Sequence, residues 1–306
     1  MNIAVFGATS GLGRDLIAAL SDEGFKIIAI GRDQQRLRAT IASPATFKVA
    51  DLRDPASLSV ALDGADMVVS VAHARFTEAI LAAAPDRCRR IVLLGSTRRF
   101  TRLPDRSADA VRAAEAALAA SGRSGVMLHP TMIYGRPGDR TIRRIIEYFQ
   151  RWPRWLPVPV PLPAGGRTLV QPIFASDVVQ AIRMALVRSE APGSAIVVAG
   201  PVATTSADLV RACARATGRT ALLLPAPLGL LRAAVQLATR FGIVATLSAR
   251  EVERLVEDKH FDVEAMRRRL GVDPVPLSVG LDQRNYRTSD LDTALATPPR
   301  IERRVR

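Results

Sequence analysis

Asn2-Ile-Ala-Val-Phe-Gly-Ala-Thr-Ser-Gly-Leu-Gly-Arg14 is the stretch of this 306-residue chain that decides its fold class. A short apolar run ends at a first glycine, two more glycines follow, and an amphipathic helical pattern begins after them. Glycines let a backbone turn sharply and approach phosphates, and the helix N-terminus offers N–H groups and a positive dipole. This order predicts a binding site for a dinucleotide pyrophosphate. Its predicted residues are Gly7, Thr9, Ser10, Gly11, Leu12, Gly13 and Arg14.

The end of the second predicted strand indicates which dinucleotide binds. In dinucleotide-binding folds, the residue that meets the adenosine ribose lies roughly 20 residues after the glycine motif. An acid there favours NAD(H), but this chain has Gly31 followed by Arg32. Guanidinium groups pair well with phosphate oxygens, so Arg14 and Arg32 favour the 2′-phosphate of NADP(H). The alternative, in which Asp33 binds the ribose of NAD(H) and Arg32 is a solvated surface residue, stays open.

Short apolar runs alternate with amphipathic helical patterns through the first half of the chain. Continuous apolar runs such as 90–95 indicate strands that are buried on both faces of a parallel sheet. The alternation predicts right-handed crossovers and an α/β fold with a Rossmann-type doubly wound parallel sheet. We predict strands at 2–6, 26–30, 46–50, 66–71, 90–95 and 125–129, and helices at 12–22, 34–42, 55–62, 75–84 and 108–121.

The composition changes near residue 150, where 151–163 contains five prolines and excludes an ordinary helix. Helices are predicted at 176–187 and 207–217, with a strand at 195–198 between them. From these patterns we predict three regions. They are an NAD(P)-binding Rossmann domain over 1–150, a smaller mixed substrate lobe over 151–285 that interleaves with it, and a basic, disordered tail over 286–306.

A strongly apolar segment, Leu222–Val244, is interrupted only by Arg232 and Arg240. We predict a helix that packs over the cofactor domain and lines an apolar pocket or a dimer contact. Peripheral membrane contact through an interfacial helix is a minor alternative. No run of 18 uncharged apolar residues predicts a spanning helix, and the start of the chain has no basic, apolar leader pattern.

The net charge of +14 comes almost entirely from arginine, because lysine occurs only at 26, 48 and 259. The arginines are dispersed and only 5% of the residues are aromatic, whereas a nucleic-acid surface needs a dense basic face with aromatics. We therefore predict phosphate ligands and solvated helix faces, and no nucleic acid. Cys88 and Cys213 are too few for a disulfide framework, which fits a cytoplasmic protein. The three histidines lack metal-ligand spacing, so we predict no metal.

Further motifs follow the strands, among them Asp51-Leu52, Ser70-Val-Ala-His-Ala74, His129-Pro-Thr-Met-Ile-Tyr-Gly135, Gln171-Pro-Ile-Phe-Ala-Ser-Asp-Val-Val179 and Asp258-Lys-His-Phe-Asp262. Together with the glycine motif they resemble the short-chain dehydrogenase/reductase superfamily over residues 1 to about 285. The extended and atypical group, which is epimerase/dehydratase-like or NmrA-like, is the most similar. The resemblance implies that Asp51 and Leu52 contact the adenine, that Ala72 and His73 pass the cofactor riboses, and that Pro130 lies by the nicotinamide.

The chain departs from this family at the catalytic pair, Tyr-x-x-x-Lys, in which the tyrosine exchanges a proton with the substrate. None of its three tyrosines has a lysine four residues later. The register set by Ala113-Ala-Glu115 puts Ser107 at the tyrosine position and Val111 at the lysine position. The remaining catalytic candidates are Ser96 and Thr97, at the family's serine or threonine position, and Tyr134. His73 and His129 are second-tier candidates for the proton donor.

The resemblance therefore implies an NADP-preferring oxidoreductase or epimerase-like enzyme with an atypical site. Its substrate is expected to be a small polar or nucleotide-linked molecule. The alternative is a catalytically silent protein that senses NADP(H) or serves as a structural accessory. NAD(H) remains the second choice of cofactor. The resemblance also leaves open a homodimer through the helices near 75–84 and 108–121, as in many relatives.

Overall fold

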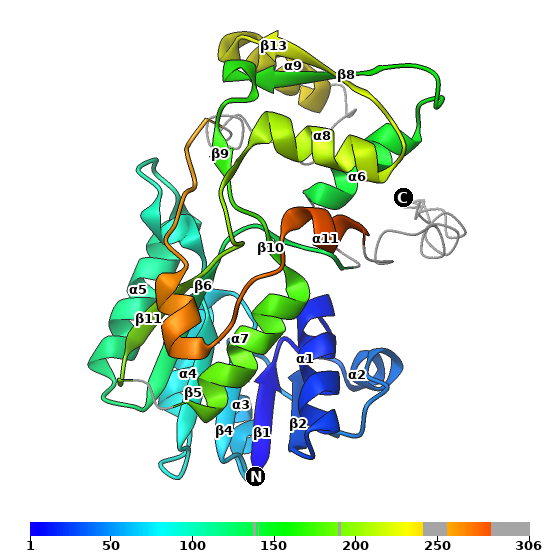
Figure 1. Ribbon diagram of the computed structural model, residues 1–306. Helices are drawn as coiled ribbons and strands as arrows, with labels where there is room; N and C mark the ends of the chain where they lie inside the picture. The colour runs from blue at the N-terminus through cyan, green and yellow to red at the C-terminus, as the bar shows by residue number, and fades with distance from the viewer. Residues whose placement is uncertain (137–138, 140, 189–190, 241–255, 283–306) are drawn as a thin grey trace, which may run out of the picture.

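The fold is taken from a computed structural model, which describes residues 1–136, 139, 141–188, 191–240 and 256–282. A seven-stranded parallel sheet with strand order β11-β6-β5-β4-β1-β2-β3 forms the base of the molecule (Figure 1). The predicted α/β fold with a doubly wound parallel sheet is confirmed. Its strands are β1 (Asn2–Phe6), β2 (Lys26–Gly31), β3 (Thr46–Val49), β4 (Met67–Ser70), β5 (Arg90–Leu94), β6 (Gly125–Pro130) and β11 (Ser194–Val198).

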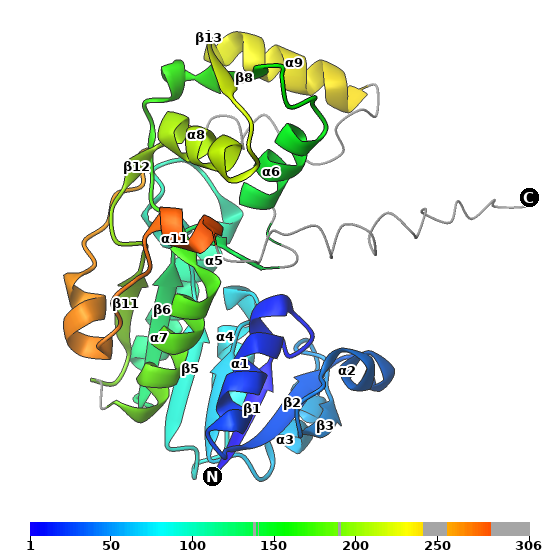
Figure 2. The ribbon, with the colours of Figure 1, turned by 45° about the vertical axis from the view of Figure 1, so that its right-hand side comes forward.

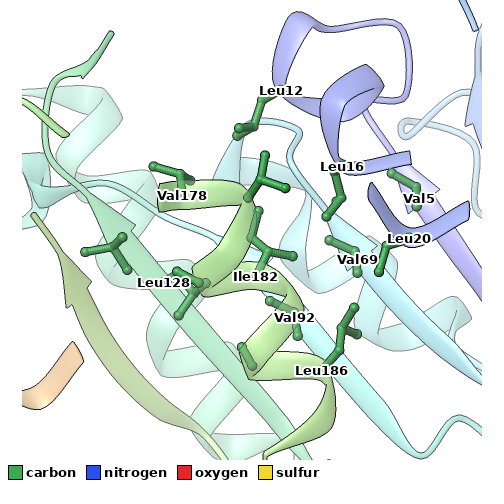
Figure 3. Packing of buried hydrophobic residues seen from close by; sticks show 14 of the residues in the cluster. Val5, Leu12, Leu16, Leu20, Val69, Val92, Leu128, Val178, Ile182 and Leu186 are labelled. Carbon is green, nitrogen blue, oxygen red and sulfur yellow. The ribbon is translucent and has the colours of Figure 1, made fainter. Parts of the chain in front are cut away.

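Helices cover both faces of this sheet, because successive strand residues point to opposite sides. Val5 of β1 joins the core under α1 and α7, and Phe6 joins the core under α3, α4 and α5. Figure 3 shows Ile182 of α7 close to Val69 and Val92 of the sheet. The six helices are α1 (Gly11–Asp22), α2 (Gln34–Thr40), α3 (Pro55–Leu62), α4 (Thr77–Ala83), α5 (Arg106–Ala120) and α7 (Ala175–Val187).

The chain leaves the sheet after β6 and returns to it before the lobe is complete. Helix α7 packs on α1, and β11 pairs with β6 in parallel. These two elements fall inside the region predicted as substrate lobe, yet they belong to the layers of the Rossmann sheet. The single boundary at residue 150 stays a prediction, and the interleaving is more extensive than the composition indicates.

Most of the remaining elements gather beyond the C-terminal ends of the strands (Figure 2), whereas the short η4 packs beside the sheet against α7 and β11. A separate apolar cluster in the lobe includes Tyr134, Phe149 and Cys213. The larger elements are α6 (Ile142–Gln150), β8 (Val158–Pro163), α8 (Ser206–Ala216), β13 (Ala221–Ala226) and α9 (Leu228–Arg240). The shorter ones are η1 (Ala74–Phe76), η2 (Thr97–Phe100), β7 (Ile133–Tyr134), η3 (Ala164–Gly166), β9 (Leu169–Val170), β10 (Ile173–Phe174), β12 (Thr204–Thr205), η4 (Met266–Leu270) and α11 (Leu277–Asp282).

The proline-rich segment forms strand β8, which pairs in parallel with β13. Proline has no N–H to donate and is confined to edge strands. Because proline occupies every second position, the N–H groups of Val158, Val160 and Leu162 remain as donors. The Val158 N–H donates to the Thr220 carbonyl at 2.9 Å. A strand therefore replaces the ordinary helix that the prolines exclude.

The helix predicted from Leu222 begins later than expected. Residues 221–226 form β13, and α9 starts at Leu228. Helix α9 lies at the end of the lobe far from the sheet, so the predicted packing over the cofactor domain is wrong (Figures 1 and 2). The prediction is wrong for 222–226 because Pro225 and Pro227 interrupt a helix there. Residues 241–244 and the predicted tail over 286–306 lie outside the described residues. No helix in the described part of the chain is both long and apolar enough to cross a membrane.

Candidate functional site

Two glycines shape the turn between β1 and α1. Gly7 has φ +77°, and a Cβ there would lie 2.8 Å from Val71 Cγ2. A Cβ at Gly13 would overlap the Gly7 carbonyl oxygen and lie 3.0 Å from the Ala8 Cα. Both positions require glycine, since the chain doubles back on itself at this point. The turn brings the start of α1 against the end of β1.

The start of α1 has the donor groups that an anion requires. The Ser10 hydroxyl accepts the Gly13 N–H at 3.0 Å, so this predicted ligand also serves as the helix cap. The first-turn N–H groups of Gly11 and Leu12 have no partner within the helix. The Leu12 side chain lies in the core. Arg14 follows half-buried, and its Nε is buried without a hydrogen-bond partner among the described residues. These groups fit the pyrophosphate site predicted from the sequence.

A cavity of about 250 Å³ opens beside this turn, between the ends of β1, β2 and β3. Six of the predicted cofactor residues line it. Its apolar wall includes Leu52 and Phe76, and its polar groups include three arginines. The predicted residues in the lining are Gly7, Thr9, Arg32, Asp51, Leu52 and Ala72.

The sequence analysis missed two of the three arginines in this first cavity, Arg53 and Arg75. Both follow strand ends already assigned to the cofactor, two residues after Asp51 and His73, and that position was the available signal. The Arg75 guanidinium lies 4.6 Å from the centre of the Phe76 ring. The Asp51 carboxylate accepts the Arg53 N–H at 3.0 Å. The cavity therefore has three guanidinium groups and one carboxylate.

Asp33, the alternative ribose ligand, serves another purpose. Its carboxylate accepts the Arg36 N–H at 3.1 Å and caps helix α2. It is absent from the lining of the first cavity, whereas Arg32 is part of it. A carboxylate that caps a helix stabilises it by about 1 kcal/mol, so the role of Asp33 in the fold is explained without a ligand.

A second cavity, of about 460 Å³, follows at the ends of β4 and β5. It shares Ala72 with the first cavity and includes His73 and Ser96. Burial and the neighbouring Arg75 and Arg98 lower the pKa of His73. Its Nδ1 accepts the Arg75 N–H at 3.2 Å, so the remaining ring nitrogen is the one that can face a ligand.

Helix α5 forms the opposite wall of the second cavity with Ser107 and Val111. These residues are one helical turn apart and occupy the positions where the resemblance places tyrosine and lysine. A small hydroxyl and an aliphatic side chain thus face this space. Arg112 points elsewhere, because its guanidinium donates to the Arg99 carbonyl at 2.8 Å and to Asp109.

The two hydroxyl candidates at the end of β5 face different cavities. Ser96 lines the second cavity, and its oxygen accepts the Arg98 N–H at 3.2 Å. Thr97 lines a third cavity, and its hydroxyl donates to the Pro130 carbonyl at 3.2 Å. Both side chains hold the η2 turn, so a catalytic role for either stays a prediction. Pro130 ends β6 and contributes this carbonyl.

Behind this turn lies a buried polar network centred on His129, whose side chain is 1% exposed. Its Nδ1 accepts the Ser96 N–H at 3.2 Å, so the ring proton must be on Nε2, which lies 2.9 Å from Glu115. Glu115 also pairs with Arg99 Nε at 2.8 Å. Burial lowers the pKa of His129, although Glu115 opposes the shift. His129 is thus a neutral support for the Ser96 turn.

Tyr134 lies away from the three cavities, in the apolar cluster of the lobe. It is fully buried, with its ring 5.4 Å from that of Phe174. A Cβ at Gly280 of α11 would overlap its hydroxyl. Burial raises the pKa of this phenol. Tyr134 as proton donor stays a prediction, and its packing favours a structural role.

One further arginine that the sequence analysis missed connects the lobe to the cofactor domain. Arg136, two residues after Tyr134, is 8% exposed and pairs with Asp15 of α1. Burial lowers the pKa of Arg136, and Asp15 opposes that shift. The pair joins the segment after β7 to the helix that starts the dinucleotide site. No group of three potential metal ligands occurs in the described ranges.

Comparisons with known proteins agree with this geometry. Residues 7–147 match the family model described as NAD(P)H-binding. An uncharacterized protein of Mycobacterium tuberculosis strain H37Rv, Rv2047c, is 27% identical over 284 residues. That match covers 90% of this chain and 28% of the relative, so the chain spans less than a third of the length of the curated relatives it matches.

Solved structures share the fold over nearly the whole chain. Epimerase Mth375 from Methanothermobacter thermautotrophicus has a TM-score of 0.74 at 15% identity, covering 97% of this chain and 94% of that chain. The nucleoside-diphosphate-sugar epimerase PA4631 from Pseudomonas aeruginosa has 0.69 at 24%, covering 92% and 95%. A short-chain dehydrogenase/reductase superfamily protein from Agrobacterium tumefaciens with bound NAD has 0.69 at 16%, covering 97% and 98%.

These matches agree with the motifs quoted from the sequence. Residues 7–147 therefore form an NAD(P)H-binding domain, and the chain shares the fold of these epimerases and of this short-chain dehydrogenase/reductase superfamily protein, in agreement with the predicted resemblance.

Proposed function

We propose that the chain is an NADP(H)-dependent oxidoreductase or epimerase-like enzyme that acts on a small polar or nucleotide-linked substrate. The observation that carries the choice of cofactor is the set of three arginines, Arg32, Arg53 and Arg75, in the first cavity. Guanidinium groups bind phosphate oxygens strongly and are always charged. The capping role of Asp33 supports the same choice, because it explains that carboxylate without a ribose.

The cofactor, when bound, supplies or accepts a hydride. The chain's own groups then orient the substrate and handle the proton. In the second cavity, the side chains that can hydrogen-bond a substrate oxygen include Ser96, Ser107 and His73. The lowered pKa of His73 keeps its ring neutral near pH 7. Because Nδ1 accepts the Arg75 N–H, the ring proton is on Nε2, which can donate a hydrogen bond to a substrate oxygen. The site thus relies on hydrogen bonds where relatives use Tyr-x-x-x-Lys.

The cofactor assignment is tested by Arg32→Ala. We expect the affinity for NADPH to fall roughly tenfold or more, because a hydrogen bond to a charged group contributes about 1.5–3 kcal/mol. The affinity for NADH should stay the same, since it has no 2′-phosphate. Isothermal calorimetry with both cofactors measures the difference. Arg36→Ala, which removes an exposed arginine outside the cavity lining, is the matched control. Equal NADPH affinity in Arg32→Ala and the parent would contradict the assignment.

A second function, an NADP(H) sensor or accessory protein without turnover, is favoured by one observation. Val111 lines the second cavity at the position where the resemblance expects lysine. Such a side chain cannot hold the nicotinamide ribose by a charge or lower the pKa of a proton donor. NADPH fluorescence with a panel of aldehydes, ketones and nucleotide sugars separates the two functions. Substrate-dependent loss of fluorescence supports the enzyme, and tight binding without any loss supports the sensor.

A further inference from the structure

The third cavity has a volume of about 540 Å³ and lies between two segments that are far apart in the sequence. One wall is the turn that follows β5, from Thr97 to Arg102. The other wall is Glu257–Phe261, about 155 residues later in the chain. The lining contains Arg98, Arg102 and Lys259, with the rings of Phe100 and Phe261 beside them.

Glu257, two residues before Lys259, joins the two walls of the third cavity by hydrogen bonds. Both carboxylate oxygens of Glu257 lie 2.8 Å from the Thr101 hydroxyl. One of them also accepts the Arg102 N–H at 2.9 Å. Glu257 therefore bonds to the opposite wall through neutral donors, and it positions the Arg102 backbone.

The second wall is also held from behind. The Asp258 carboxylate accepts the Leu169 N–H at 2.8 Å, and the Lys259 N–H donates to the Leu169 carbonyl at 2.9 Å. Gln171 accepts the Phe261 N–H at 2.8 Å and donates to its carbonyl at 3.1 Å. The main chain of this wall is thus fixed by the protein's own hydrogen bonds, which lowers the entropy cost of binding.

The third cavity continues the line of the other two. Ala72 lines the first and second cavities, and Arg98 lines the second and third. Arg98 Nη1 lies 3.6 Å from Asp105, and its side chain is 43% exposed, so part of it faces solvent. The cofactor's adenosine end would lie at one end of this line, and the third cavity lies at the other, beyond Ser96.

We propose that the third cavity binds an oxyanion, a carboxylate or a phosphate, carried by the substrate. Arg98, Arg102 and Lys259 provide the positive charge. The lining also contains the carboxylates of Glu257 and Asp258, which are hydrogen-bonded to the opposite wall and to the Leu169 N–H. Threonine and histidine side chains and the two aromatic rings complete it. The inference rests on the proposed function for the identity of the ligand as substrate. An anion anchored here would place the adjoining carbon of the substrate towards Ser96 and the second cavity.

The test uses the full chain saturated with NADP⁺, so that the arginines of the first cavity are already occupied. Calorimetry measures the binding of inorganic phosphate and of succinate, which represent the two sources of oxyanion. We expect saturable binding of at least one, weakened by salt. Arg102→Gln should lower that affinity roughly tenfold, because it removes a charged donor. Arg154→Gln, which changes an exposed arginine outside the lining, should leave it unchanged.

The inference would be overturned if neither anion showed saturable binding, or if Arg102→Gln bound the anion with the same affinity as the parent. Lys259→Gln repeats the test on the opposite wall. NADPH affinity, measured for the same variants, separates this outcome from the proposed function. If a variant loses anion binding but keeps the NADPH affinity of the parent, the substitution affects the third cavity and not the cofactor site. A parent that binds the anion but not NADPH would reject the proposed function and support the inference.

Discussion

Replacing Gly13 with valine is expected to weaken dinucleotide binding about a hundredfold. The new Cβ would overlap the Gly7 carbonyl oxygen and approach the Ala8 Cα to 3.0 Å, and both are backbone atoms that no rotamer change can move. Helix α1 would have to shift away from β1 and take its first-turn N–H groups with it. Overpacking of this kind costs about 3 kcal/mol, which corresponds to about a hundredfold loss of affinity. Titration of nicotinamide fluorescence with NADPH measures the loss.

The control for this variant is Gly229→Ala in α9, where an added Cβ meets nothing within 4 Å. It should bind NADPH as the parent does. Circular dichroism and urea unfolding establish whether the Gly13 variant is folded, and Gly13→Ala provides a smaller change at the same position. A folded Gly13→Val protein with parental NADPH affinity would show that the dinucleotide does not bind at this turn.

Replacing His129 with leucine is expected to lower the free energy of unfolding by about 3 kcal/mol. Leucine cannot accept the Ser96 N–H or donate to Glu115, so two largely buried groups lose a partner, at about 1–3 kcal/mol each. Arg99 remains beside Glu115 and limits the loss. Urea unfolding measures it. His260→Leu, which changes an exposed histidine, should alter stability by less than about 0.5 kcal/mol. A similar stability for both variants would contradict the network.

The same histidine determines a pH dependence. Its pKa in the folded protein is below the ordinary value of 6.5, because burial outweighs Glu115, and Arg99 acts in the same direction as burial. As pH falls below 6.5, the unfolded chain gains a proton that the folded chain does not yet bind, so stability decreases until the folded pKa is reached. Urea unfolding at a series of pH values should show this decrease in the parent. His129→Leu should lack that component; an identical pH profile would contradict it.

The sequence predicted the central sheet closely, because apolar runs between glycine-rich turns leave little choice for a buried parallel strand. The strand at 195–198 was also predicted, but its place was not. An apolar run indicates burial without indicating a neighbour, and the pairing of β11 with β6 depends on the path of the whole lobe. Parts of the candidate site could not be predicted, because their residues come together only in the folded chain. His129 and Glu115 are 14 residues apart on different elements, and Arg53 and Arg75 were hidden in a general excess of arginine.

The late return of the chain to the sheet has a consequence for its synthesis. The apolar face formed by Val69, Val92 and Leu128 is covered by α7, residues 175–187 (Figure 3). When only residues 1–150 have emerged from the ribosome, this apolar face of the strands is therefore exposed. Such surface favours aggregation and chaperone capture. A fragment that stops at residue 150 should be insoluble, and one extended through β11 should be markedly more soluble when expressed.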